Sequence, residues 1–271
     1  MRKLRWIVLG VALTALLSVA GIAAGKGIKI SERSVAFTVD PFAQETADCG
    51  GKRAVSGGFF GGSDPLATPL ISTRREQSQW TFRAGAFNGT PADATAYVYC
   101  VKESRFPRLR TGSEDGAVDF DQLGSVTAEC PGSRRAISGG FEVPLHEFFV
   151  TTSMRSGRGS WTVEFYNRGG ASETDVEAFV YCANGVKLRQ RSSETLLPDG
   201  DPETEVARCK RNQRVVSGGF DTESDREAVT VGHSTVSRRA GKRAWEVSAF
   251  AEADPQPLTV FAYCLKQRKR R

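Results

Sequence analysis

The segment Arg135-Ala136-Ile137-Ser138-Gly139-Gly140-Phe141 decides the fold, because the chain repeats its pattern twice more. The matching segments begin at Arg53 and Arg214, and each copy is followed by a tryptophan and later by an aromatic residue next to a closing cysteine. The cysteines that open the copies recur at intervals of about 80 residues: Cys49, Cys130 and Cys209. A period of this length with so many shared landmarks indicates three copies of one structural unit.

Each copy predicts about four antiparallel strands. The segment after the opening cysteine alternates apolar and polar residues and ends in Gly-Gly, which is typical of a β-bulge or of a close backbone approach. A second strand precedes the tryptophan, a third begins at it with a period of two, and the last carries the aromatic residues before the closing cysteine. Turns such as Arg158-Gly159 separate the strands. The expected fold class is therefore all-β.

The copies define three expected repeats, at residues 33–104, 122–186 and 203–266, with polar, turn-rich joins between them. Two architectures fit this pattern. Three sheets around a threefold axis would form a β-prism, which we favour slightly, and three small β domains in tandem would be the alternative. In a prism, six aromatic residues are expected in the shared core: Phe59, Trp80, Phe141, Trp161, Phe220 and Trp245.

Residues 1–24 are expected to form a signal peptide, because a basic head precedes an uncharged run that closes in small residues. Cleavage near Ala23 or Ala24 is the favoured interpretation. An uncleaved anchor is the alternative, since about 20 apolar residues span a bilayer. Both interpretations place the rest of the chain outside the cytoplasm, either secreted or on the extracellular face of the cell envelope.

The six cysteines are even in number and favour a disulfide framework in an exported chain. Pairing within each repeat would join Cys49–Cys100, Cys130–Cys182 and Cys209–Cys264. Pairing between repeats would join Cys100–Cys130, Cys182–Cys209 and Cys49–Cys264. We favour the first scheme, because it treats all three repeats alike and lets the first and last strands of each lie side by side.

The formal net charge of +6 comes from the two ends of the chain. Eight basic residues lie in the N-terminal head and the last six positions, where residues 267–271 form a basic tail. The body between them is close to neutral and offers no general electrostatic footprint for a phosphate backbone. We therefore expect no nucleic-acid partner, and membrane contact only through an uncleaved N-terminal segment.

The repeat pattern, C-x-x-G-x-R-x-[IV]-S-G-G-F followed by W-T-V and F-V-Y-C, resembles one found in secreted proteins of actinobacterial type. The second copy matches it best, whereas the first has Cys49-Gly50-Gly51 and the third Cys209-Lys210-Arg211-Asn212. The resemblance covers nearly the whole expected mature chain and implies a fold, but it brings no functional residues. In overall plan the chain is also similar to the egg vitelline membrane outer-layer protein, a threefold β-prism.

No motif of a known catalytic or metal site is present. The two histidines, His146 and His233, occupy non-matching positions, so no metal or other cofactor is expected. Ser56, Ser138 and Ser217 precede each Gly-Gly, and their threefold repetition favours a hydrogen-bonding role in the fold over a nucleophile. We predict that the protein is not an enzyme. An exported hydrolase that uses carboxylates in the joins, Glu114-Asp115 or Asp119 and Asp121, is the alternative.

Arginines recur at equivalent positions of the repeats and are the candidate ligand-binding residues: Arg53, Arg135, Arg214, Arg74, Arg155 and Arg239. A guanidinium group grips a carboxylate or phosphate in a bidentate way, and three equivalent weak sites would strengthen one another on an acidic polymer. The competing interpretation is a solvated strand face or local ion pairs with Glu129, Glu164 or Glu177. The expected function is a non-catalytic binding or structural role at the cell envelope, with a polysaccharide or an extracellular protein as partner.

Overall fold

A computed structural model describes residues 27–62, 68, 70–86, 90–143, 148–168, 173–223, 229–238, 241, 243–252 and 254–267. These residues form 18 strands and one short 3-10 helix, so the all-β class is confirmed. Four features of the sequence lie outside the described residues: the expected signal peptide, His146, Arg239 and most of the basic tail.

The strands fall into three units of six, one for each sequence repeat. The first unit contains β1 (Ile30–Val39), β2 (Phe42–Asp48), β3 (Arg53–Phe60), β4 (Leu70–Glu76), β5 (Gln79–Gly85) and β6 (Ala92–Val101). After the helix η1 (Glu103–Arg105), the second contains β7 (Arg110–Asp119), β8 (Leu123–Glu129), β9 (Arg135–Glu142), β10 (Phe148–Met154), β11 (Ser160–Asn167) and β12 (Glu173–Ala183). The third contains β13 (Leu188–Leu197), β14 (Glu203–Arg208), β15 (Gln213–Asp221), β16 (Val229–Val236), β17 (Ala244–Ala251) and β18 (Gln256–Lys266).

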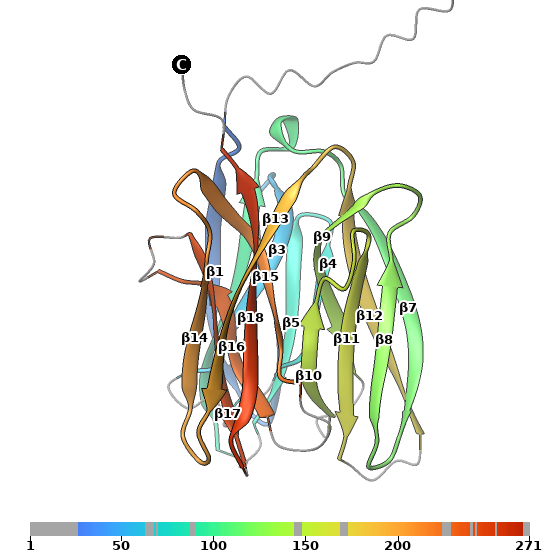
Figure 1. Cartoon of the computed structure of the whole chain (residues 1–271), viewed down its shortest axis with the longest axis vertical. Coiled ribbons are helices and arrows are strands. Elements are labelled where there is room, and N and C mark those ends of the chain that lie inside the picture. Colours follow the sequence, from blue (N-terminus) through green and yellow to red (C-terminus); the bar gives the residue numbers. More distant parts are fainter. Residues whose placement is uncertain are drawn as a thin grey trace, which may run out of the picture.

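Each sheet combines strands of two units. Sheet A has the order β1-β6-β3-β16-β17-β14, sheet B the order β2-β5-β4-β9-β12-β7, and sheet C the order β13-β18-β15-β10-β11-β8. The seams between units are short antiparallel pairings, such as Thr73 with Phe141 in sheet B. Figure 1 shows the strands running along the long axis of the molecule. The units thus share sheets, as expected for the favoured prism-like architecture, and do not form three separate domains.

The structure contains two more strands per unit than the sequence pattern predicts. The additional strands form a hairpin at the start of each unit: β1–β2, β7–β8 and β13–β14. Units two and three therefore begin at Arg110 and Leu188, within the joins that precede the expected repeats. These strands were missed because they lie at sheet edges and are mostly polar, as the exposure along β7 shows. Each hairpin places its two strands in different sheets and so turns a corner of the prism.

Disulfides cross the same corners. The bonds join Cys49–Cys100, Cys130–Cys182 and Cys209–Cys264, which confirms pairing within each repeat. In the first unit Cys49 follows β2 of sheet B, whereas Cys100 lies in β6 of sheet A. Each disulfide therefore fastens one sheet to the next.

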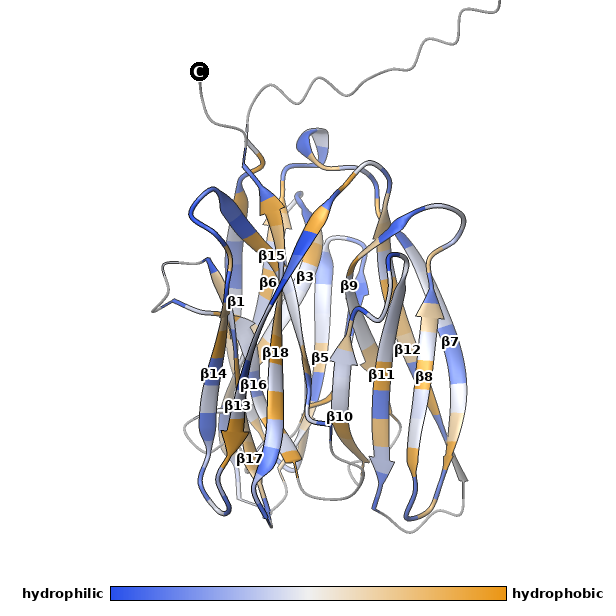
Figure 2. Ribbon diagram, viewed as in Figure 1, coloured by the Kyte–Doolittle hydropathy of each residue, from blue (hydrophilic) through white to orange (hydrophobic). Residues whose placement is uncertain are grey.

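The predicted aromatic core is confirmed. Its six residues are all at most 5% exposed, and together they line a small cavity of about 50 Å³. Each tryptophan meets the edge or face of a buried tyrosine from another unit: Trp80 with Tyr181, Trp161 with Tyr263, and Trp245 with Tyr99. Figure 2 shows hydrophobic residues interspersed with hydrophilic ones along β8 and β11, as expected when one face of a strand packs on a core.

The three repeated serines close a ring of hydrogen bonds between units. The hydroxyl of Ser138 donates to the carbonyl of Val55 at 2.6 Å, and that of Ser56 donates to the carbonyl of Val216 at 2.5 Å. Ser217 donates in turn to Ile137, which completes the cycle. Each accepting residue is the extra residue of a β-bulge, just before the serine of its own unit. The serines thus serve the fold, as their repetition predicts.

The Gly-Gly pairs mark close approaches, while the bulge lies two residues before the first glycine. A Cβ on Gly139 would lie 2.2 Å from the ring of Trp161, so the first glycine makes room for the indole. A Cβ on Gly140 would lie 2.1 Å from the carbonyl oxygen of Thr73, across the seam between two units. The same contacts recur at the equivalent glycines of the other units.

Candidate functional site

Three arginines converge on one open groove of sheet C. The groove has a volume of about 530 Å³ and lies between the end of β10, the strands β13 and β18, and the first residue of β9. We call it the arginine groove, and it is lined by Arg135, Met154, Arg155, Ser156, Gly157, Arg158, Leu188, Gln190 and Phe261. None of these residues is acidic. The groove therefore presents hydrogen-bond donors and positive charge, with two apolar walls.

Arg155 is the most firmly positioned of the three. Its guanidinium lies over the ring of Tyr263, 4.9 Å from the centroid, and donates to Oε1 of Gln190 at 3.4 Å. Its backbone N–H donates to the buried Tyr263 hydroxyl at 2.7 Å, which fixes the start of the β10–β11 turn. Burial lowers the pKa of the Arg155 guanidinium, and the nearby charge of Arg135 lowers it further. Arginine still remains charged near neutral pH, because its ordinary pKa is above 12.

The positive charges in this groove lack a carboxylate partner within the part of the chain that the structure describes. Arg135 lies close enough to Arg155 to lower the pKa of the Arg155 guanidinium, so the two positive charges repel each other, and an anion between them would relieve this repulsion. A planar carboxylate or phosphate oxygen pair matches the guanidinium donors. Arg135 and Arg155 were both predicted as ligand-binding residues, and the structure brings them together.

The equivalent arginines of the first corner already have hydrogen-bond partners. Arg53 donates to the carbonyl of Phe106 at 2.6 Å and lies 3.6 Å from a carboxylate oxygen of Glu103. Arg75, which matches Arg155 because its N–H also donates to a buried tyrosine hydroxyl, donates from Nε to the carbonyl of Ala54 at 2.9 Å. The arginines of this corner are bound by groups of the protein itself, so the corner does not form a second arginine groove.

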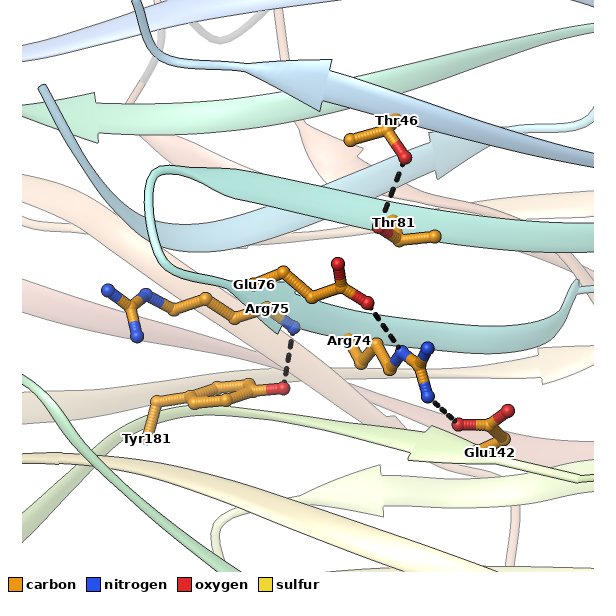
Figure 3. A network of polar contacts seen from close by, with 7 residues as sticks. All are labelled: Thr46, Arg74, Arg75, Glu76, Thr81, Glu142 and Tyr181. Carbon is orange, nitrogen blue, oxygen red and sulfur yellow. Dashed lines mark hydrogen bonds and ion pairs between the residues drawn. The ribbon is translucent and has the colours of Figure 1, made fainter. Parts of the chain in front are cut away.

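The remaining predicted arginines do not form equivalent sites either. Arg74 contacts Glu142 and lies 3.0 Å from Glu76, as Figure 3 shows, so it takes part in a surface ion-pair network. Arg214 is exposed on β15, and at the third corner Val236 stands where Arg155 stands at the second. Among the described residues, the structure thus provides one groove in which the arginines lack carboxylate partners, in place of three matching sites. Within the described residues, the ion pairs of the predicted arginines use Glu76, Glu103 and Glu142, and not Glu129, Glu164 or Glu177.

The first carboxylate pair considered for a hydrolase, Glu114 and Asp115, does not share one face of its strand. Glu114 and Asp115 are neighbours on β7, so their side chains point to opposite faces of the strand. Asp121 accepts a hydrogen bond from the Tyr166 hydroxyl at 2.5 Å. Sequence reasoning missed Gln190, because it lies on β13, in a join read as turn-rich. The sequence did point to Arg158 as a candidate, because it belongs to the basic cluster before Trp161.

No protein-family model matches the chain, and no curated protein is detectably similar to it. Three disulfides within one chain are typical of proteins that fold outside the reducing cytosol. None of the described residues belongs to an apolar helix long enough to cross a bilayer.

Proposed function

We propose that this protein is an exported, non-catalytic binding module of the cell envelope, whose arginine groove holds an anionic group of an envelope polysaccharide. Export is supported by the basic and apolar pattern of residues 1–24 together with the three disulfides. The observation that carries the binding proposal is the convergence of Arg135, Arg155 and Arg158 on a groove without an acidic wall.

The groove suits one acidic sugar unit of a longer chain. Its volume lies within the range of roughly 300–1,000 Å³ typical of ligand pockets, and it is open to solvent along the sheet. The apolar walls, Leu188 and Phe261, can pack against the ring of a sugar, while the guanidinium groups hold its carboxylate or phosphate. Because the described residues form one such site, binding to a polymer carrying many acidic units would rely on rebinding along the polymer and not on three linked sites.

The test is retention of the disulfide-intact protein on immobilised acidic and neutral envelope polysaccharides over a range of salt concentrations. We expect retention on the acidic polymers and its loss as salt rises, because ions screen exposed charges. Arg155→Gln should weaken binding about tenfold or more, since a hydrogen bond between charged groups contributes about 1.5–3 kcal/mol.

The matched control is Arg189→Gln, which removes the same charge from an exposed residue of β13. Arg189 lies between two groove residues on the strand, so its side chain points away from the groove. If both substitutions weaken binding to the acidic polymer equally, the effect comes from net charge alone and the proposed site is wrong. A protein that is retained on no acidic polymer would leave a protein partner as the better interpretation.

A further inference from the structure

A second groove lies on the outer face of sheet A and differs in chemistry from the arginine groove. It has a volume of about 500 Å³, and its walls include Phe60, Tyr97, Thr204, His233, Glu246 and Ser248. We call it the sheet A groove. It lies where the third unit meets the first, because β16 pairs with β3 at this seam. All six side chains come from strands, so the backbone that carries them is fixed by the sheet.

A histidine and a glutamate face each other in this groove. Nε2 of His233 lies 3.2 Å from Oε1 of Glu246, and their side chains are only 13% and 14% exposed. The imidazole also meets the ring of Phe60 edge to face, with centroids 5.0 Å apart. Removing two ionisable groups from water costs free energy that their mutual contact need not restore. The pair is therefore a feature that stability alone does not explain.

The other two sheets show that the fold does not need this pair. The residue after each tryptophan is Glu246 in sheet A, but Thr81 in sheet B and Thr162 in sheet C. Thr81 forms a hydroxyl pair with Thr46 at 3.1 Å (Figure 3), and Thr162 forms one with Thr127 at 2.7 Å.

The seam position of His233 is equally distinct. It pairs with Phe60, and the corresponding residues are Ser72 opposite Glu142 in sheet B and Thr152 opposite Asp221 in sheet C. A serine in sheet B and a threonine in sheet C thus occupy the position that His233 has in sheet A. Only sheet A combines aromatic rings with an imidazole and a carboxylate at these positions, which marks it as a specialised surface.

The charges of the groove indicate an uncharged ligand. Arg238 also lines it, lies over the ring of Tyr97 and forms an ion pair with Glu32 at 3.2 Å. The guanidinium of Arg238 thus already has a carboxylate partner, and the carboxylate of Glu246 lies against the imidazole of His233. An anionic ligand would meet the carboxylate of Glu246, and a cationic ligand would meet the guanidinium of Arg238.

The shape of the groove and its hydrogen-bonding groups indicate the chemical class of this uncharged ligand. Aromatic rings offer flat apolar surfaces, and a pyranose ring has an apolar C–H face that packs on them. Carboxylate, imidazole and hydroxyl groups between them supply both donors and acceptors for the hydroxyl groups of a sugar. The hydroxyls of Thr204 and Ser248, 3.0 Å apart, extend this polar row toward the edge strand β14.

We propose that the sheet A groove binds a neutral sugar unit, with Phe60 and Tyr97 as the ring platform and His233 and Glu246 as the hydrogen-bonding pair. This site is independent of the arginine groove, which lies on another sheet. The two sites differ in a measurable way, because binding of a neutral sugar should hardly change with salt.

The experiment is a titration of the disulfide-intact protein with neutral gluco-, galacto-, manno- and N-acetylglucosamine oligosaccharides, followed by saturation-transfer NMR and calorimetry. We expect saturable binding to at least one of them. The double substitution His233→Thr/Glu246→Thr, which installs the residues found in sheet C, should keep the fold and lower the affinity at least tenfold. Arg155→Gln is the matched control and should leave this binding unchanged, so failure of the arginine groove can be told apart from failure of this site.

A second variant keeps the test decisive if the double variant does not fold. Phe60→Glu places at the seam the residue type that Glu142 has in sheet B, and it should also abolish sugar binding. Near-ultraviolet circular dichroism reports whether each variant is folded. The proposal is overturned if no neutral oligosaccharide binds saturably, or if folded variants bind with the affinity of the unaltered protein.

Discussion

Replacement of Ser138 by alanine tests whether the serine ring holds the three units together. The Ser138 hydroxyl lies 2.6 Å from the carbonyl oxygen of Val55, and the two residues are 2% and 0% exposed. Alanine removes the donor, so a buried carbonyl loses this partner. An unsatisfied buried group costs about 1–3 kcal/mol. For a chain of this size each kcal/mol lowers Tm by about 2–4 °C, so we expect a decrease of roughly 2–12 °C.

The assay is differential scanning calorimetry of the oxidised protein, with urea unfolding as a second measure. Ser125→Ala is the matched control, because Ser125 is exposed on the edge strand β8 and surface substitutions usually change stability by no more than about 0.5 kcal/mol. If Ser138→Ala lowers Tm no more than the control does, the hydrogen bond between units contributes nothing measurable. The role assigned to the repeated serines would then be wrong.

Three further changes probe the corner, the seam and the core. Removing one disulfide by Cys130→Ala/Cys182→Ala should lower the free energy of unfolding by about 4 kcal/mol on the chain-entropy model, since the two cysteines are 52 residues apart; an unchanged urea midpoint would contradict this. Gly140→Ala should cost roughly 1–3 kcal/mol or more, because its Cβ would lie 2.1 Å from the Thr73 carbonyl oxygen, and an unchanged Tm would show that the seam can open. Burial raises the pKa of Tyr99, Tyr181 and Tyr263 far above their ordinary value of about 10. The folded protein holds these phenolic protons more tightly than the unfolded chain does, so their contribution to stability is complete below about pH 10 and is lost as the pH rises above it. Tyrosinate absorbance during alkaline titration should therefore show three of the five tyrosines ionising only on unfolding, and free ionisation of all five in the folded state would refute their burial.

The candidate sites could be predicted only in part. Arg135 and Arg155 were identified because they recur at equivalent repeat positions, but recurrence also suggested three matching sites. Whether an arginine is available depends on neighbours distant in sequence, such as Glu103 beside Arg53. The pairing of His233 with Glu246 follows from strand register, which periodicity does not reveal.

By itself the sequence determined the all-β class, the three repeats and the aromatic core, because these depend on local patterns that recur along the chain. The favoured disulfide scheme also came from the repeat and is confirmed. Only the tertiary structure decided that each unit divides its strands between two sheets, since that division depends on hydrogen bonds between units at short seams. It also decided which groove keeps its positive charges without carboxylate partners and which holds an imidazole against a carboxylate. The three repeats are similar in sequence but differ at these grooves, because the side chains contact residues of other units. Those residues lie far away along the chain, so a local sequence pattern does not reveal them.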